Sequence, residues 1–152
     1  MSDLQSFYLI SLGCPKNLVD SEGIATLLRR AGYASTVDPA EADLLIVNTC
    51  GFIEPARAES RAVLQELVQS KQSGQCVVAA GCYSQRCPGE LAEAVPGIDG
   101  LIGTRRWMDI WHLVERLEQR GELLWPSHPI YHIPGVPSVG QDTQGIVRAA
   151  VQ

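Results

Sequence analysis

Three cysteines in this sequence, Cys14, Cys50 and Cys82, each follow a short apolar run that has the composition of a buried strand. The middle run, residues 44–47, consists of four branched apolar residues, which is typical of a strand buried on both faces of a parallel sheet. A turn and a helix are expected after each run. Because the carboxyl ends of parallel strands share one edge, where open α/β sheets bind ligands, we expect the three thiols to meet in space.

Soft thiolates favour iron–sulfur clusters, zinc or copper. The Cys-x2-Cys knuckles of most structural zinc sites are absent from the sequence. Three cysteine ligands on a four-iron cluster leave one iron without a protein ligand, where a small molecule can bind. Each thiol also precedes an expected helix start, which stabilises negative charge. Three small buried core residues are the alternative interpretation. Three cysteines in the same structural position favour a shared metal site at Cys14, Cys50 and Cys82.

The two remaining cysteines occupy different positions. Cys76 opens the strand that Cys82 follows, and a strand of that length spans roughly 20 Å, so Cys76 is expected at the opposite edge as a core residue. Cys87 lies in the segment after Cys82. It is a candidate fourth ligand, a candidate second thiol for exchange, or a residue without a role.

Polar residues flank two of the thiols. Lys16 and Asn17 follow Cys14, and Asn48 precedes Cys50. They are candidate donors to cluster sulfurs or to a substrate. The alternative is solvent exposure for the lysine and turn capping for the asparagines.

The apolar periodicity predicts the order β-α-β-β-α-β-α-β-α, which indicates an α/β domain of three layers with right-handed crossovers. The expected sheet is mostly parallel and has about five strands. Strands are predicted at residues 7–12, 33–37, 44–49, 76–80 and 100–103. Helices are predicted after the turn at 13–17, from about 55 to 71, around 91–95 and at 107–119.

The chain of 152 residues predicts one domain over residues 1–120 and a proline-rich linker or extended tail without regular structure over 121–152. Four prolines fall in that tail: Pro126, Pro129, Pro134 and Pro137. The chain has a net charge of −5, whereas domains that bind nucleic acids usually carry a basic patch or a net positive charge. No membrane span and no signal peptide are evident. We therefore expect a cytoplasmic domain with reduced thiols, no membrane contact and no direct nucleic-acid binding.

Three motifs resemble those of the radical-SAM methylthiotransferases. They are Ser-Leu-Gly-Cys-Pro-Lys-Asn-Leu-Val-Asp-Ser-Glu at 11–22, Asn-Thr-Cys-Gly-Phe-Ile at 48–53 followed by Ala-Glu-Ser at 58–60, and Gly81-Cys82 with Arg86. The Gly-Cys-Pro-Lys-Asn form is similar to the RimO branch. The resemblance covers about residues 7–119 and identifies the chain with the N-terminal cluster-binding (UPF0004) domain of that family.

The resemblance implies that Cys14, Cys50 and Cys82 hold an auxiliary 4Fe-4S cluster. The resemblance to the RimO branch implies that this cluster is used to place a methylthio group on the β-carbon of an aspartate in a small-subunit ribosomal protein. Family members continue into a radical-SAM barrel, whose Cys-x3-Cys-x2-Cys motif binds the cluster that cleaves S-adenosylmethionine. This sequence lacks that motif. The chain alone is therefore expected to be inactive, to contain no catalytic residue, and to meet S-adenosylmethionine only through the barrel.

Two other functions compete with this one. The first is a stand-alone iron–sulfur or metal-binding module without catalysis. The second is a thiol redox protein on a flavodoxin-like frame that uses Cys82 and Cys87.

Overall fold

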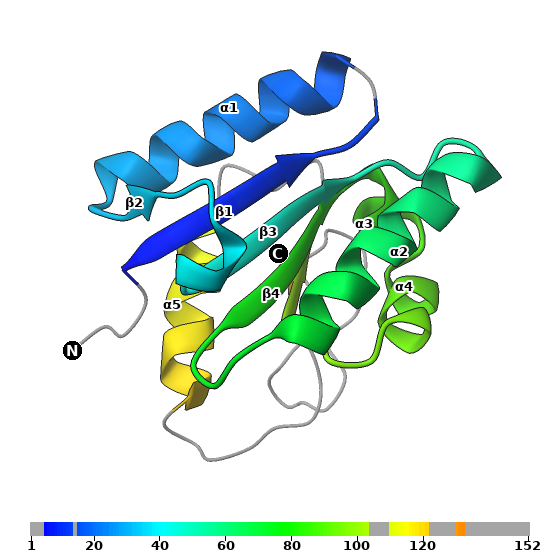
Figure 1. The fold of residues 1–152 in the computed structure, drawn as a ribbon. Helices are drawn as coiled ribbons and strands as arrows, with labels where there is room; N and C mark the ends of the chain where they lie inside the picture. The colour runs from blue at the N-terminus through cyan, green and yellow to red at the C-terminus, as the bar shows by residue number, and fades with distance from the viewer. Residues whose placement is uncertain (1–4, 14, 104–109, 122–129, 133–152) are drawn as a thin grey trace.

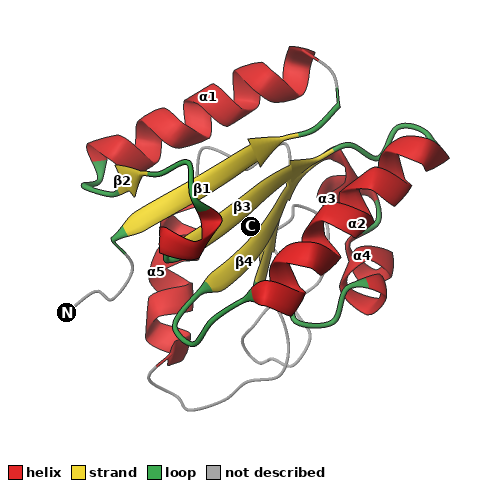
Figure 2. Cartoon of the chain, viewed as in Figure 1, coloured by secondary structure: helices red, strands yellow, loops and turns green. Residues whose placement is uncertain are grey.

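The computed structural model describes residues 5–13, 15–103, 110–121 and 130–132, and they form a parallel sheet with helices on both faces (Figures 1 and 2). The strand order is β2-β1-β3-β4-β5-β6, and all neighbours are parallel. The strands are β1 (Ser6–Ser11), β2 (Ala34–Ser35), β3 (Leu44–Thr49), β4 (Cys76–Gly81), β5 (Gly100–Ile102) and β6 (Ile130–His132). The helices are α1 (Pro15–Arg30), the 3-10 helix η1 (Pro39–Glu41), α2 (Glu54–Ser70), α3 (Cys82–Arg86), α4 (Pro88–Ala94) and α5 (Ile110–Gly121).

The predicted fold class is confirmed. All six residues of β3 are buried, as the unbroken apolar run indicated, because β3 lies between β1 and β4 and is covered on both faces. Alternate residues of β3 point to opposite cores. Leu44 and Ile46 pack beneath α1 and α5, whereas Leu45 and Val47 pack beneath α2, α3 and α4. The domain therefore has three layers, and the sheet is the middle one.

Two local predictions were wrong. The turn expected at residues 13–17 ends earlier, because α1 begins at Pro15 and already contains Lys16 and Asn17. Proline suits the first position of a helix, where its missing N–H would have no intrahelical partner. The single short helix expected after β4 is two helices, α3 and α4, and Pro88 begins the second of them.

The prediction of a tail without regular structure was wrong at residues 130–132. Ile130, Tyr131 and His132 form β6, which pairs with β5 and gives the sheet a sixth strand. The strand has only three residues and lies between prolines, so the sequence pattern did not indicate it. The other residues after Gly121 lie outside the part of the chain that the structure describes.

The topology creates a switch point between β1 and β3. From β1 the chain passes through α1 to β2, whereas from β3 it passes through α2 to β4 on the other side. The arrowheads of β1, β3 and β4 point to the same edge in Figure 1. Open α/β sheets bind ligands at such a point, outside the carboxyl ends of the strands. No helix within the described residues is long and apolar enough to span a membrane.

Candidate metal centre

Strand register brings Cys50 and Cys82 to neighbouring positions at the carboxyl edge of the sheet. Thr49 of β3 is paired with Gly81 of β4, and each cysteine is the next residue in its chain segment. Neighbouring strands lie about 4.8 Å apart, so the two backbones leave the sheet side by side. Both cysteines are partly buried. Each of these two cysteines directly follows a strand end, as predicted, and the pairing of the two strands is a finding of the structure.

Cys14 lies outside the described residues, but the glycine before it contacts the site. A Cβ built on Gly13 would lie 2.6 Å from Cys50 Cβ and 2.8 Å from Cys50 Sγ, and Gly13 has a φ of +90°. No side chain fits there, and few residues other than glycine adopt that backbone conformation. The loop after β1 therefore packs directly on Cys50.

The loop after β3 is also in contact with the start of α3. A Cβ on Gly51 would lie 2.7 Å from Tyr83 Cα, so the residues that follow Cys50 and Cys82 touch through their backbones. Cys50 thus lies between the loop after β1 and the start of α3. Convergence of the Cys14 thiol itself remains a prediction.

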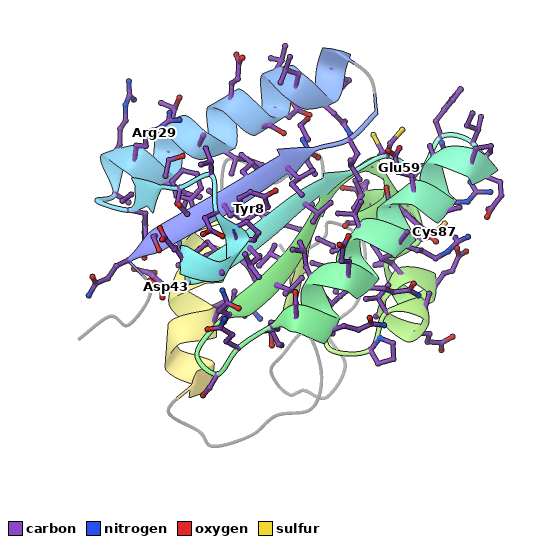
Figure 3. The ribbon with its side chains drawn as sticks, in the orientation of Figure 1. Tyr8, Arg29, Asp43, Glu59 and Cys87 are labelled. Carbon is purple, nitrogen blue, oxygen red and sulfur yellow. The ribbon has the colours of Figure 1, made fainter. Side chains whose placement is uncertain are left out.

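Cys76 and Cys87 occupy other surroundings. Cys76 begins β4 opposite Leu44 at the amino edge of the sheet, partly buried against the core, and its predicted position is confirmed. Cys87 joins α3 to α4 and packs against the core beneath α2 (Figure 3). None of the four cysteines that the structure describes forms a disulfide. Among the described residues, which do not include Cys14, no group of three or more His, Cys, Asp or Glu side chains could hold a metal ion.

The asparagines build the frame and have no hydrogen left for a ligand. Asn17 Nδ2 donates to the carbonyl oxygens of Leu12 at 2.7 Å and Thr49 at 2.8 Å. Asn48 Nδ2 donates to Asn17 O at 2.8 Å and Ser21 Oγ at 2.9 Å. A side-chain amide carries two N–H donors, so both donors of Asn17 and both donors of Asn48 are used within the protein. In this arrangement the side-chain N–H groups of both asparagines are engaged within the protein, so the structure does not support the interpretation in which they donate to cluster sulfurs.

Lys16 lies on the outer side of α1. Its side chain is 66% exposed and forms an ion pair with Asp20 at 3.1 Å. Of the two interpretations given for Lys16, the structure favours solvent exposure.

Ser60 is a site residue that the sequence reasoning did not assign. It is fully buried on α2, and its Oγ accepts from Cys50 N at 3.0 Å and donates to Cys50 O at 3.1 Å. One hydroxyl therefore satisfies both backbone groups of a cysteine that has left its strand. The available signal was a serine in helical register with Leu64 and Leu67, which form the buried face of α2.

Tyr83 secures the segment that carries Cys82. Its ring is fully buried, and its hydroxyl donates to Glu90 and accepts from Arg61 Nη1 at 2.7 Å. Burial raises the pKa of this hydroxyl. Arg61 also holds the pKa of Glu54 below its usual value through a hydrogen bond of 2.6 Å. These contacts join α2, α3 and α4 beside the candidate centre.

Apolar side chains flank the cysteine-bearing loops. Among the described residues five large apolar side chains are exposed, and four of them are near the cysteines in sequence: Leu18, Val19, Phe52 and Ile53. Phe52 and Ile53 lie between Cys50 and α2, and Leu18 and Val19 belong to the first turns of α1. We call these four residues the apolar rim.

The donor set fits a soft metal or an iron–sulfur cluster. Two thiols leave adjacent strands at one edge, and the loop that leads to a third cysteine packs on the first of them. Partly buried sulfur donors of this kind suit iron–sulfur clusters, zinc or copper(I) rather than magnesium or calcium. No carboxylate or imidazole of the described residues joins them.

Comparisons with known proteins match this part of the chain. The family described as "Uncharacterized protein family UPF0004" matches residues 6–103. A protein of Chloroflexus aurantiacus named "Ribosomal protein uS12 methylthiotransferase RimO" is 46% identical over 128 residues, covering 84% of this chain and 28% of that protein. Proteins of the same name from Pelotomaculum thermopropionicum and Trichlorobacter lovleyi are 47% and 49% identical, covering 81% and 68% of this chain and 28% and 24% of their own length. The chain therefore spans about a quarter of these relatives.

Proposed function

Because the chain belongs to the UPF0004 family and is similar to uS12 methylthiotransferases, we propose that it is the N-terminal, cluster-binding domain of a RimO-type methylthiotransferase. In this proposal Cys14, Cys50 and Cys82 hold an auxiliary 4Fe-4S cluster. When bound, the cluster supplies an iron without a protein ligand, where sulfur can be held. The domain covers residues 1–120, and residues 121–152 link it onward, with β6 adding one strand to the sheet.

The pairing of Thr49 with Gly81 is the observation that carries the proposal. Cys50 and Cys82 directly follow these two neighbouring strands, next to the switch point between β1 and β3, and open α/β sheets bind ligands at such a point. The contact of Gly13 with Cys50 supports the third ligand, because Cys14 is the next residue along that loop. This chain's own contribution is to arrange the thiols and to limit solvent around them.

The substrate and partners are proposed from the relatives. Their name assigns them to ribosomal protein uS12, so we propose an aspartate of that small-subunit protein as the substrate. The transfer needs a radical-SAM barrel, which binds S-adenosylmethionine, and this sequence does not contain the barrel's Cys-x3-Cys-x2-Cys motif. The four exposed residues of the apolar rim adjoin Cys14 and Cys50 in the sequence, and such exposed large apolar side chains support a contact between this part of the chain and such a domain.

Anaerobic reconstitution with iron and sulfide tests the cluster directly. We expect a brown protein that retains about four iron and four sulfide ions per chain after desalting. A colourless protein that retains zinc alone would favour the metal-carrier alternative. A colourless protein that forms a reversible Cys82–Cys87 disulfide would favour the thiol redox alternative. Either result would contradict the proposed function.

A further inference from the structure

Asn17 is completely buried and contacts the loop after β1, the end of β3 and the start of α3, which we call the three cysteine-bearing loops because each leads to or carries a motif cysteine. We propose that Asn17 is the positioning residue of the metal centre, and that its side-chain amide ties these loops together before any metal binds. Its Nδ2 donates to Leu12 O in the loop after β1 and to Thr49 O directly before Cys50. Its Oδ1 lies 3.9 Å from Cys82 Sγ, after β4. One side chain therefore contacts segments next to all three motif cysteines.

The two carbonyl groups determine the orientation of this amide. Both accept from Nδ2, which has two hydrogens to give. In the flipped orientation Oδ1 would face two other oxygens, and the buried carbonyls would lose their donors at a substantial cost in free energy. Oδ1 is therefore the atom that faces Cys82. Asn17 acts by holding backbone and is not itself a ligand.

A second amide holds the backbone of Asn17 in place. Asn48 Nδ2 donates to Asn17 O at 2.8 Å and to Ser21 Oγ at 2.9 Å, so β3 is attached to the first turns of α1. Asn48 is also buried, 1% exposed. The Asn17 side chain thus projects from a fixed point on α1 toward the loops. This matters because cysteines far apart in the sequence can share a cluster only where the fold holds their loops close.

Gln75 offers a matched comparison at the opposite edge of the sheet. Its Nε2 donates to Pro39 O at 2.9 Å and to Ala42 O at 2.6 Å, just before β4 begins. Like Asn17, it is a side-chain amide that ties loop carbonyls from elsewhere in the chain. Unlike Asn17, it lies at the amino ends of the strands, away from the motif cysteines. Loss of either amide should weaken the fold, but only loss of Asn17 should disturb the metal centre.

The inference rests on the proposed function, and the experiment has one readout that does not need a cluster. Wild type, Asn17→Ala, Asn17→Ser and Gln75→Ala are compared by local amide hydrogen exchange and by iron retained after anaerobic reconstitution. We expect exchange at residues 12–13 and 49–51 to accelerate about tenfold in Asn17→Ala, because each net hydrogen bond lost corresponds to a factor of that order. Iron retention should fall severalfold, and Asn17→Ser, which keeps one donor, should be intermediate. Gln75→Ala should lower the Tm but retain iron as wild type does.

The outcomes separate the two claims. If wild type retains no cluster, the proposed function fails, and the exchange rates alone decide whether Asn17 ties the loops. If Asn17→Ala does not fold, Asn17→Ser decides, and a result equal to wild type in exchange and iron retention would overturn the inference. Equal iron loss in Asn17→Ala and Gln75→Ala at equal Tm would also overturn it, because the effect would then be general destabilisation.

Discussion

Cys50 is held by contacts from two other elements of the fold. Gly13 packs against its side chain from the β1 loop, and Ser60 satisfies its backbone N–H and C=O from α2. Buried backbone groups need such partners once a strand ends. Two neighbours from different elements therefore fix the position of this thiol.

Replacing Ser60 with alanine tests this arrangement. We expect Ser60→Ala to lower the free energy of unfolding by about 1–3 kcal/mol, because it leaves a partly buried Cys50 N–H without the Ser60 hydroxyl as its partner. Ser70→Ala is the control, since Ser70 lies on the same helix and its Oγ donates to Glu66 O at 3.0 Å on an exposed side. Urea unfolding of both variants gives the comparison. Equal small losses would show that the hydroxyl of Ser60 does not support Cys50.

At the residue scale, the sequence was a good guide to which side chains could bind a metal. It was a poor guide to the hydrogen-bond partners of those side chains and their neighbours. Residue type and strand length were enough to separate Cys76 from Cys50 and Cys82, and the structure confirms that separation. The partners of the Asn17 and Asn48 side chains were not predicted, because they come from other elements, such as Thr49 O at the end of β3 and Ser21 Oγ on α1. Hydrogen-bond partners that are distant in sequence leave no local pattern.

At the element scale, the packing of α2, α3 and α4 around Tyr83 holds the segment that carries Cys82. The hydroxyl of Tyr83 bridges Arg61 on α2 and Glu90 on α4, and Arg61 also pairs with Glu54 at 2.6 Å. The bridge forms because a buried hydroxyl requires hydrogen-bond partners. The short helix α3 is thereby connected to both of its neighbours.

This bridge should make stability depend on alkaline pH. Burial raises the pKa of Tyr83 above its ordinary value of 10.0, so the folded state favours the protonated phenol. The stability from this group is present below pH 10 and falls as pH rises further, because the unfolded chain ionises first. We expect Tyr83→Phe to be less stable by about 1 kcal/mol at pH 7 and to lose less stability above pH 10. Urea unfolding of wild type and Tyr83→Phe across that pH range checks this. If the free energy of unfolding fell equally with pH in both proteins, the prediction would be contradicted.

Helix and strand types were predictable because the apolar periodicity was strong. Leu64 and Leu67 on α2, for example, are buried as their spacing indicated. Element boundaries were less predictable. The start of α1 at Pro15 and the division between α3 and α4 at Pro88 depend on proline serving as a first helical residue, which the turn interpretation overlooked.

At the scale of the whole molecule, strand order determines where the centre lies. The order β2-β1-β3-β4-β5-β6 puts the switch point beside Cys50, and this order was not predictable from one sequence. Local patterns give the strands, but their neighbours are chosen by contacts between distant segments. The sixth strand was missed because it has only three residues and lies between prolines, so its pairing with β5 leaves little local pattern.

The sixth strand has a measurable consequence. A chain that ends at Gly121 lacks β6, so the free edge of β5 becomes exposed and its ladder bonds are lost. We expect this shortened chain to have a lower Tm than the full chain and to aggregate more readily. Differential scanning calorimetry and light scattering check both points. An unchanged Tm would show that β6 adds nothing to the stability of the domain.

The central claim is that Cys14, Cys50 and Cys82 together hold a cluster, and the iron content of cysteine variants tests it most directly. Each variant is reconstituted anaerobically and desalted before iron is counted. We expect Cys14→Ser, Cys50→Ser and Cys82→Ser to lose most of their iron, because serine cannot replace a soft thiolate. Cys76→Ser, at the amino edge, and Cys87→Ser should retain it. Equal iron in all five variants, or loss in Cys76→Ser matching that in Cys50→Ser, would contradict the claim.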